Sequence, residues 1–333
     1  MDTNRGILLC GEVEKGKLAS ISLELLGIGR KLANELGQEL GILLMGSKIG
    51  DLAPEAIAFG ADKVYLGDAA ALEQYNSDAY TMVAANLCRK ISPDIVILGQ
   101  TDIGRDMAAR LAGRLQGALA TDCLELAIDK DSKLLRSTRP VFGGNAVATL
   151  ISKGARPQMA TIRSRTMAPA ERDNARKGEV VPFDVAIDAS AIKVKVVEQV
   201  EEKAEGVKLE DAQVVVSGGR GIGSTDNFKM LWDLASLFDG AVGGTRAACE
   251  QGWLPMTRQV GQTGKIVSPK LYIAVALSGA MQHVAGCSGS KCIVAINKDP
   301  DANIFKVAHY GIVGDFKEAV PGLIEKFKEI LSK

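Results

Sequence analysis

The chain has 333 residues, which is long for a single hydrophobic core and favours two domains. Forty acidic residues balance forty lysines and arginines, so the net charge gives no support for a nucleic-acid or anionic-membrane partner. No apolar run reaches the roughly 18 residues of a membrane span, and the first predicted strand begins too near Met1 to leave room for a leader. We therefore expect a cytoplasmic protein without membrane insertion.

The first half of the chain alternates short apolar runs with amphipathic stretches. The apolar runs predict buried parallel strands at 7–13, 41–45, 63–66 and 94–99. Apolar residues at helical spacing predict helices at 22–36, 53–58, 77–91 and 103–115. Strands and helices that alternate in this way predict an α/β domain, with a mostly parallel sheet flanked by helices.

From about residue 122 the pattern indicates strands alone, at 123–129, 134–140, 145–152 and 158–162, which we interpret as sheet extensions or hairpins that close the first domain. One more strand is predicted at 193–200. The charged, apolar-poor segment 201–206 then predicts a connector, which gives domains at 1–203 and 204–333.

A second α/β pattern follows the connector, and we expect a second Rossmann-like domain. Strands are predicted at 213–216, 271–277 and 292–296, with a helix at 228–238 and an amphipathic closing helix from Gly322. The six cysteines form no CxxC pair, and Cys287 and Cys292 have no second pair near them. We therefore expect neither a metal site nor an iron–sulphur cluster.

Glycine-rich and polar loops follow the predicted strands of the second domain, where open α/β sheets bind their ligands. Segment 217–223 would bring backbone amides close to a phosphate, although its spacing is not that of the GxGxxG fingerprint. A tight turn without a ligand is the alternative for this segment. In segment 242–248 one guanidinium, Arg246, stands among small residues, and an exposed arginine at a helix start is the alternative.

The densest polar loop is 259–265, which holds two amides and a hydroxyl between glycines. A merely structural turn rarely needs so many polar groups. Further along, Ser278 is a predicted N-cap, so that the amides of Gly279 and Ala280 would face an anionic ligand. His283 would lie on the first turns of that helix, where a structural role is the alternative.

These segments together resemble the C-terminal signature of electron transfer flavoprotein alpha subunits. The resemblance covers the second domain almost without gaps, at 218–221, 227–228, 246–248, 252–253, 259–265, 271–274, 278–286, 294–300, 304–305 and 310–315. The first domain is similar at 27–32, 93–99, 104–106, 143–146 and 156–161. The sequence departs from the family pattern at Thr245 (often Ser), Met256 (often Asn), His309 (often Asp) and Ser164-Arg165 (usually Pro-Gly).

The resemblance implies that FAD lies extended along the second domain. It implies that Thr263 Oγ reaches N5 of the flavin, that His283 faces the N1–C2=O edge, that Arg246 stacks above the ring, and that Ser278 with the following amides takes the phosphates. Asn297 and Asp315 would bind the adenosine half. The cofactor-binding residues implied in this way are Arg220, Gly221, Thr245, Arg246, Gln259, Val260, Gly261, Gln262, Thr263, Ser278, Gly279, Ala280, Met281, Gln282, His283, Asn297, Asp315 and Phe316.

The resemblance also implies an electron carrier rather than a classical enzyme. Such a chain forms a heterodimer with a beta subunit and passes single electrons from an acyl-CoA dehydrogenase or similar flavoenzyme, as in fatty acid β-oxidation, to an acceptor such as a quinone oxidoreductase. The alternative within the family is electron bifurcation, in which NADH oxidation is coupled to the reduction of ferredoxin and an enoyl-CoA. Segment 22–33 looks more like the bifurcating relatives.

Two readings from other classes stay open. An NAD-dependent Rossmann-type enzyme is disfavoured by the defective fingerprint and by the lack of an acidic residue at the ribose distance. A non-redox scaffold with a vestigial nucleotide site would leave the dense polar loop and His283 without a purpose.

Overall fold

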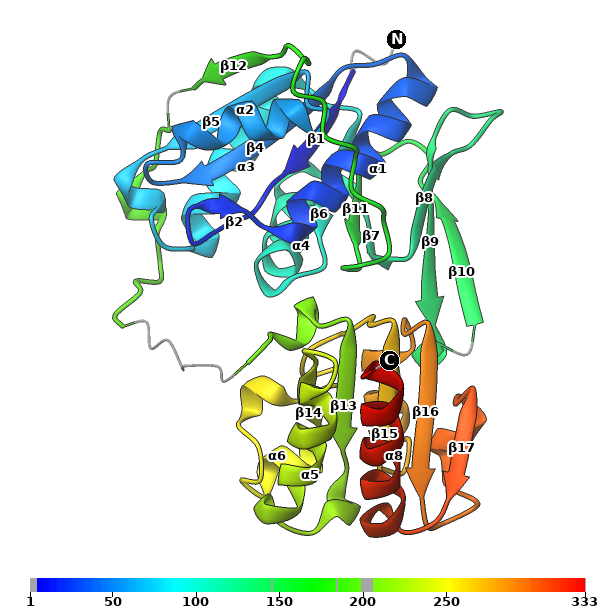
Figure 1. Ribbon diagram of the computed structural model, residues 1–333. Coiled ribbons are helices and arrows are strands. Elements are labelled where there is room, and N and C mark those ends of the chain that lie inside the picture. Colours follow the sequence, from blue (N-terminus) through cyan, green and yellow to red (C-terminus); the bar gives the residue numbers. More distant parts are fainter. Residues whose placement is uncertain (1–4, 145, 184, 199–205, 333) are drawn as a thin grey trace. The chain divides into compact units, whose positions relative to one another are not determined.

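The computed structural model describes residues 5–144, 146–183, 185–198 and 206–332. It forms two compact units, one made of residues 1–141 and 147–200 and the other of residues 142–146 and 201–333 (Figure 1). The short segment 142–146, predicted in the first domain, clusters with the second unit. The predicted boundary between residues 203 and 204 lies outside the described residues.

The first unit is built on a seven-stranded sheet in the order β12-β5-β4-β1-β6-β11-β7, and the strand pairs with a described register are parallel. Its strands are β1 (Ile7–Cys10), β4 (Leu40–Gly46), β5 (Lys63–Asp68), β6 (Ile95–Gly99), β7 (Ala118–Cys123), β11 (Gln158–Ile162) and β12 (Glu179–Pro182). Its helices are α1 (Ser20–Leu36), α2 (Ala53–Ala58), α3 (Ser77–Ile91) and α4 (Asp102–Leu115). The predicted α/β class is confirmed.

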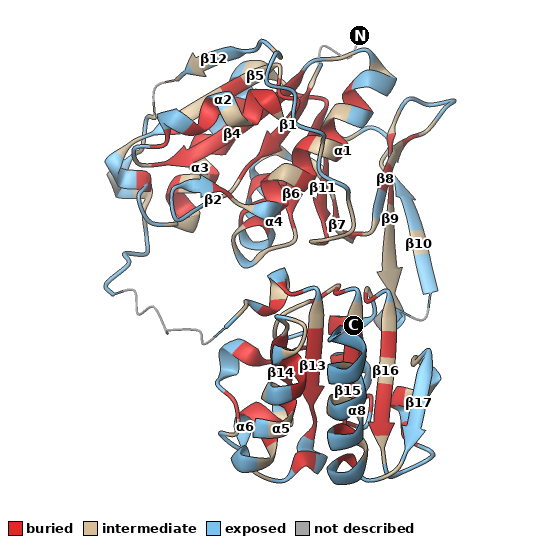
Figure 2. Ribbon diagram, viewed as in Figure 1, coloured by how far each residue is buried: buried red, intermediate tan, exposed pale blue. Residues whose placement is uncertain are grey.

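Side chains of β1 alternate between two hydrophobic clusters, one on each face of the sheet. Ile7 and Leu9 pack in the cluster that contains α1 and α2, whereas Leu8 packs in the cluster of α3 and α4. The central strands β1, β4, β6 and β11 are accordingly buried on both faces (Figure 2), which explains why β1, β4 and β6 form continuous apolar runs in the sequence. Smaller elements are the ribbon β2 (Val13–Glu14) with β3 (Lys17–Leu18), and the three-stranded sheet of β8 (Glu125–Ile128), β9 (Leu135–Val141) and β10 (Ala146–Ile151).

Three expectations for the first unit need correction. The strand predicted at 123–129 is two elements, because β7 ends at Cys123 and β8 begins at Glu125. Of the two interpretations of segment 158–162, the sheet extension is right and the hairpin is wrong, because β11 lies inside the parallel sheet between β6 and β7. Residues 193–198 are not a strand, since the Lys193 N–H donates to the Asp78 carboxylate (3.0 Å) instead of to a neighbouring strand.

The second unit has a five-stranded parallel sheet in the order β14-β13-β15-β16-β17. Its strands are β13 (Val214–Gly218), β14 (Ala241–Gly244), β15 (Leu271–Val275), β16 (Cys292–Asn297) and β17 (Tyr310–Val313). Its helices are α5 (Thr225–Ser236), α6 (Arg246–Glu250), α7 (Met281–Cys287) and α8 (Phe316–Leu331). Helices α5, α6 and α8 contribute to the core on one face, and α7 to the core on the other.

The order of these strands determines where a ligand can bind. The chain leaves β13 by α5 to reach β14 on one side, and later returns to β15 on the other side of β13. The connections that leave the carboxyl ends of β13 and β15 therefore run in opposite directions. Such a switch point opens a crevice at the carboxyl ends of the strands.

Candidate functional site

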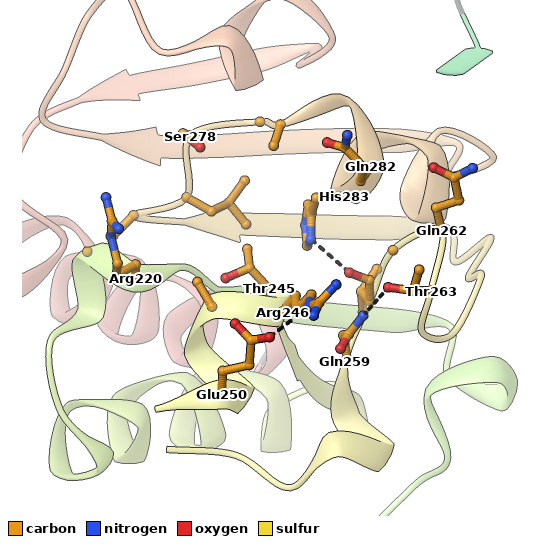
Figure 3. Close-up of a pocket in the computed structure, with 18 of the residues that line it drawn as sticks. Arg220, Thr245, Arg246, Glu250, Gln259, Gln262, Thr263, Ser278, Gln282 and His283 are labelled. Carbon is orange, nitrogen blue, oxygen red and sulfur yellow. Dashed lines mark hydrogen bonds and ion pairs between the residues drawn. The ribbon is translucent and has the colours of Figure 1, made fainter. Parts of the chain in front are cut away.

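A cavity of about 780 Å³ lies at the carboxyl ends of these strands, within the range of cofactor sites. Loops after β13, β14, β15 and β16 and the segment 259–263 converge on it (Figure 3). Most of the residues implied by the resemblance line it, namely Arg220, Gly221, Thr245, Arg246, Gln259, Val260, Gly261, Gln262, Thr263, Ser278, Gly279, Ala280, Gln282, His283 and Asn297. The same cavity is lined by Ala247, Glu250, Ala276, Leu277 and Asp299, which were not predicted.

The loop after β15 exposes its backbone to the cavity. Gly279 has a φ of +79°, and a Cβ there would lie 2.3 Å from the backbone nitrogen of Ile304, so only glycine fits without a backbone shift. The N–H groups of residues 278–281 have no acceptor among the residues that the structure describes. The loop therefore offers several backbone donors to an anionic group.

The helix that follows this loop starts later than predicted. α7 begins at Met281, its N-cap position is Ala280, and no side chain bonds there. Ser278 is thus not an N-cap, because the left-handed Gly279 turns the chain before the helix starts. The Ser278 side chain is exposed at the cavity, and its hydroxyl has no hydrogen-bond partner among the described residues. The same holds for the side chains of Arg220, Gln262 and Gln282.

Other predicted ligands use their side chains inside the protein. The Gln259 amide donates to Thr263 Oγ1 (2.9 Å), and Asn297 donates to the Leu277 carbonyl (2.9 Å) while accepting from the Asp299 N–H (3.0 Å). Thr245 Oγ1 caps α6 by accepting from the Ala248 N–H at 3.4 Å. These groups hold the loops in place, which resemblance alone did not reveal.

His283 departs most from its expected role. It is 5% exposed, its Nδ1 lies 3.0 Å from the Val260 carbonyl, and its Nε2 lies 2.9 Å from the Tyr272 hydroxyl. Burial lowers the pKa of the imidazole to about 4, an effect that the bond to Val260 only partly opposes. Both ring nitrogens therefore have partners inside the protein, and His283 also lines the cavity, so its contact with a ligand stays a prediction.

Arg246 lines the cavity and forms an ion pair with a second lining residue, Glu250. Its Nε lies 2.7 Å from Glu250 Oε1, one helical turn along α6, and the two side chains are 66% and 51% exposed (Figure 3). The guanidinium is therefore held by a carboxylate at the rim, where solvent screens the attraction. Glu250 gave no signal in the sequence beyond its i,i+4 spacing from Arg246.

Three predicted ligands do not line the cavity. Asp315 caps α8 by accepting from the Lys317 N–H (2.9 Å), and Phe316 is buried in the core that α8 shares with α5. Met281 is 57% exposed at the start of α7. Asp315 and Phe316 therefore stabilise α8, the helix that follows β17, and neither side chain lines the cavity.

The comparisons with known proteins identify the family of this chain. Residues 7–188 match the model of the electron transfer flavoprotein domain, and residues 208–288 match that of the electron transfer flavoprotein FAD-binding domain. The electron transfer flavoprotein subunit alpha of Thermoanaerobacterium thermosaccharolyticum is 45% identical over 330 residues, which cover 99% of this chain and 100% of that protein. This chain belongs to the electron transfer flavoprotein alpha-subunit family.

Other relatives extend the range of this flavoprotein family. The alpha subunit of Megasphaera elsdenii is 45% identical over 98% of this chain and 97% of its own length. The acryloyl-CoA reductase electron transfer subunit beta of Anaerotignum propionicum is 39% identical over 98% and 96%. A solved Streptomyces glycosyltransferase covers 99% of this chain and 96% of its own at 9% identity and a TM-score of 0.28, which is too low to bear on fold or function.

Family membership makes the second unit of this electron transfer flavoprotein subunit a flavin-binding domain. Among the described residues, no helix is long and apolar enough to span a membrane. Within the same residues, no three His, Cys, Asp or Glu side chains gather in a way that would hold a metal ion. The cavity of unit 2 is thus the candidate site for the flavin.

Proposed function

We propose that this alpha subunit binds FAD in the cavity of the second unit and passes single electrons between a flavoenzyme of acyl-CoA dehydrogenase type and an acceptor such as a quinone oxidoreductase. It would do so as a heterodimer with a beta subunit. The observation that carries the proposal is the convergence of unpartnered donors on one large cavity in a chain of this family.

The residues present fit a dinucleotide with a flavin at one end. When bound, FAD would supply a centre that accepts and releases one electron at a time, a chemistry that no side chain of this chain provides. The backbone amides of residues 278–281 and the hydroxyl of Ser278 would hold its pyrophosphate, because they are donors without other acceptors among the described residues. The guanidinium of Arg220, in the loop after β13 that contacts residues 276 and 277, would add a positive charge at the same end of the cavity.

The polar groups at the other end of the cavity suit the flavin ring. Gln262 and Gln282 are exposed at the cavity and have amide donors and acceptors available for its heteroatoms. The Thr263 hydroxyl oxygen accepts a hydrogen bond from the Gln259 amide. The hydroxyl hydrogen of Thr263 therefore points away from that amide and is free to donate to another acceptor. Arg246 would bring positive charge to the ring, where one-electron reduction adds negative charge.

Electron bifurcation is the alternative within the family. One relative, from Anaerotignum propionicum, is named as an electron transfer subunit of acryloyl-CoA reductase, and its 39% identity extends over nearly the whole chain. This resemblance is the observation that supports the alternative, in which the acceptor is of enoyl-CoA type. The second flavin that bifurcation requires would lie in the beta subunit.

The test is to purify the chain with its beta subunit and to count the bound cofactors. The proposal predicts the absorption bands of a yellow flavoprotein and one FAD per heterodimer, accompanied by AMP. Two FAD molecules per heterodimer would replace the simple carrier with the bifurcating alternative. A colourless heterodimer that binds NAD would contradict both and support a Rossmann-type enzyme.

A further inference from the structure

Gln259 begins the polar segment that lines the cavity, and its side chain is buried. Gln259 is 3% exposed, whereas Gln262 and Thr263, further along the same segment, are exposed. The Gln259 Nε2 donates to Thr263 Oγ1 at 2.9 Å (Figure 3). Among the described residues this is the one hydrogen bond that the Gln259 side chain makes. A buried amide is therefore directed at an exposed hydroxyl of the cavity wall.

The backbone of the segment closes around this side chain. The Gln259 carbonyl accepts from the Lys265 N–H (2.7 Å), the Gly261 N–H donates to the Lys265 carbonyl (3.1 Å), and the Gly264 N–H donates to the Gly261 carbonyl (3.0 Å). A Cβ on Gly264 would lie 2.4 Å from the Gln259 carbonyl oxygen and 2.9 Å from its Cγ. The returning backbone thus packs against the stem of Gln259, and this closed turn brings Thr263 within reach of the amide.

The chemistry of the two groups gives the bond a direction. The amide nitrogen of a glutamine only donates, so the Thr263 oxygen is the acceptor and keeps its own hydrogen. Among the described residues the Thr263 hydroxyl has no acceptor for that hydrogen. Because the Gln259 amide is neutral, the arrangement presents a hydrogen-bond donor to the cavity without adding a charge.

We propose that Gln259 is a positioning residue of the flavin site, whose buried amide keeps the Thr263 hydroxyl available as a donor to the bound cofactor. In this account Gln259 acts on FAD through Thr263 and not as a ligand of its own. The inference rests on the proposed function for the identity of the ligand, whereas the bond between the two side chains concerns the chain alone.

The bond is tested without cofactor by a double-mutant cycle in the full-length chain. Gln259→Met keeps the length of the side chain and removes the amide, and Thr263→Val replaces the hydroxyl by a methyl group. The two tryptophans, Trp232 and Trp253, both belong to the second unit, so their fluorescence follows the unfolding of this unit. We expect the unfolding constant of the double variant to be about threefold to tenfold smaller than the product of the single effects implies. Effects that simply multiply would overturn the proposal.

The consequence for the cofactor is measured as the affinity of the heterodimer for FAD. Gln259→Met lets the Thr263 hydroxyl rotate, and we expect about threefold to fivefold weaker binding. In the Thr263→Val background the same substitution should have almost no effect, because no hydroxyl is left to orient. Equal losses in both backgrounds would mean that Gln259 contacts FAD directly, and would overturn the proposal. The matched control is Gln213→Met, an exposed glutamine of the same unit outside the cavity wall, which should bind FAD as the parent does.

Gln259→Glu tests the direction of the bond, since an ionised carboxylate only accepts and would take the Thr263 hydrogen for itself. The measurement is made at about pH 9, because burial raises the pKa of a carboxyl group. We expect Gln259→Glu to bind FAD about threefold or more weaker than Gln259→Met. The same pair of variants in the Thr263→Val background corrects for the added charge.

A Gln259→Glu affinity that equals the parent's after this correction would mean that an oxygen of residue 259 faces Thr263, and would overturn the proposal. A parent heterodimer that binds no FAD, in a chain whose stability cycle shows the coupling, would reject the proposed function. The positioning of Thr263 by Gln259 would then be supported on its own.

Discussion

Arg246 and Glu250 form an ion pair in the wall of the cavity proposed to hold the flavin. The carboxylate lies 2.7 Å from the guanidinium on the same helix, and both side chains are more than half exposed. Each residue therefore changes the local electrostatic potential only modestly, because water screens an exposed charge. The sign of the effect is nevertheless opposite for the two residues.

Arg246→Ala is expected to leave the fold intact and to lower the potential for the first electron by up to about 60 mV, one tenfold step for a one-electron couple. The reason is the loss of the cation that favours the negatively charged, one-electron-reduced ring. Glu250→Gln should raise the same potential, since it removes the opposing charge and keeps the size of the side chain. Spectroelectrochemistry measures both, and a shift of the same sign in the two variants would exclude this account.

At the level of single residues, the sequence indicated most of the residues that line the cavity but not what their side chains contact. Gly279 and Gln262 lie in loops, and Arg246 begins α6 directly after a loop. The glycines and polar residues of these loops are consecutive in the sequence, so the pattern can be recognised there. The partners of His283 cannot be recognised in this way, because Val260 is 23 residues away and Tyr272 belongs to an apolar strand. His309, for which the sequence suggested no purpose, accepts from a backbone N–H of β16.

At the level of elements, the site depends on how closely α7 approaches the loop at Gly261. A Cβ on Gly286 would lie 2.4 Å from the Gly261 backbone nitrogen, so the helix and the loop touch backbone to backbone. Gly261 has itself a φ of +149°. This contact therefore sets how closely α7 approaches the cavity loop that begins at Gly261.

Gly286→Ala should therefore push α7 away from the loop. We expect a loss of about 1–3 kcal/mol in the free energy of unfolding, the usual cost of overpacking, and at least tenfold weaker FAD binding. The control is Gly113→Ala on α4, where a Cβ would meet nothing within 4 Å and the helix should gain about 0.5–1 kcal/mol. Chemical denaturation and flavin fluorescence follow the two effects. Equal stabilities of the two variants would refute the close contact.

The first unit has a similar switch point, between β1 and β6, but a carboxylate occupies it. Glu12 follows β1 and accepts from the Thr101 hydroxyl (2.6 Å), which itself caps α4, and the remaining cavity measures about 30 Å³. Burial raises the pKa of Glu12 to about 7, opposed by the Thr101 bond and helped by Asp102. The folded state therefore holds this proton more tightly than the unfolded state, whose value is near 4.5.

The sign of the pH effect follows from that difference. Protonated Glu12 contributes stability below about pH 4.5, and this contribution is lost as the pH rises through about 7. The free energy of unfolding of the parent should fall between pH 5 and 8 by about 2–3 kcal/mol more than that of Glu12→Gln. The exposed Glu73→Gln serves as the control. Parallel pH curves for parent and Glu12→Gln would show that the carboxyl ionises normally.

Two short strands of the second unit, β14 and β17, were not predicted from the sequence, for different reasons. All four residues of β17 are exposed at the edge of the sheet, and β14 is four residues long with two glycines, so neither forms an apolar run. α8 begins at Phe316, six residues before the predicted Gly322, with Pro321 inside it. Long buried strands such as β4 were predicted within one residue because burial on both faces leaves a continuous apolar signal.

For the whole molecule, the charged segment 201–206 predicts a protease-sensitive connection between the two units. Immediately after it, the Val207 carbonyl accepts from the buried Arg258 (3.4 Å), whose guanidinium stacks over Trp232 at 4.8 Å, so the second unit is anchored from this residue on. Limited proteolysis should first cut between 201 and 206 and release a fragment that starts near Val207. A first cut inside a described strand or helix of either unit would contradict the domain assignment.

FAD bound in the cavity of the second unit is proposed to exchange single electrons. A reductive titration of the purified heterodimer in a spectroelectrochemical cell, repeated with Arg246→Ala, tests it most directly. We expect the bound flavin to be reduced in two resolved one-electron steps. In Arg246→Ala the potential of the first step should be lower than in the parent. A single two-electron step in the parent, or a heterodimer without flavin, would contradict it.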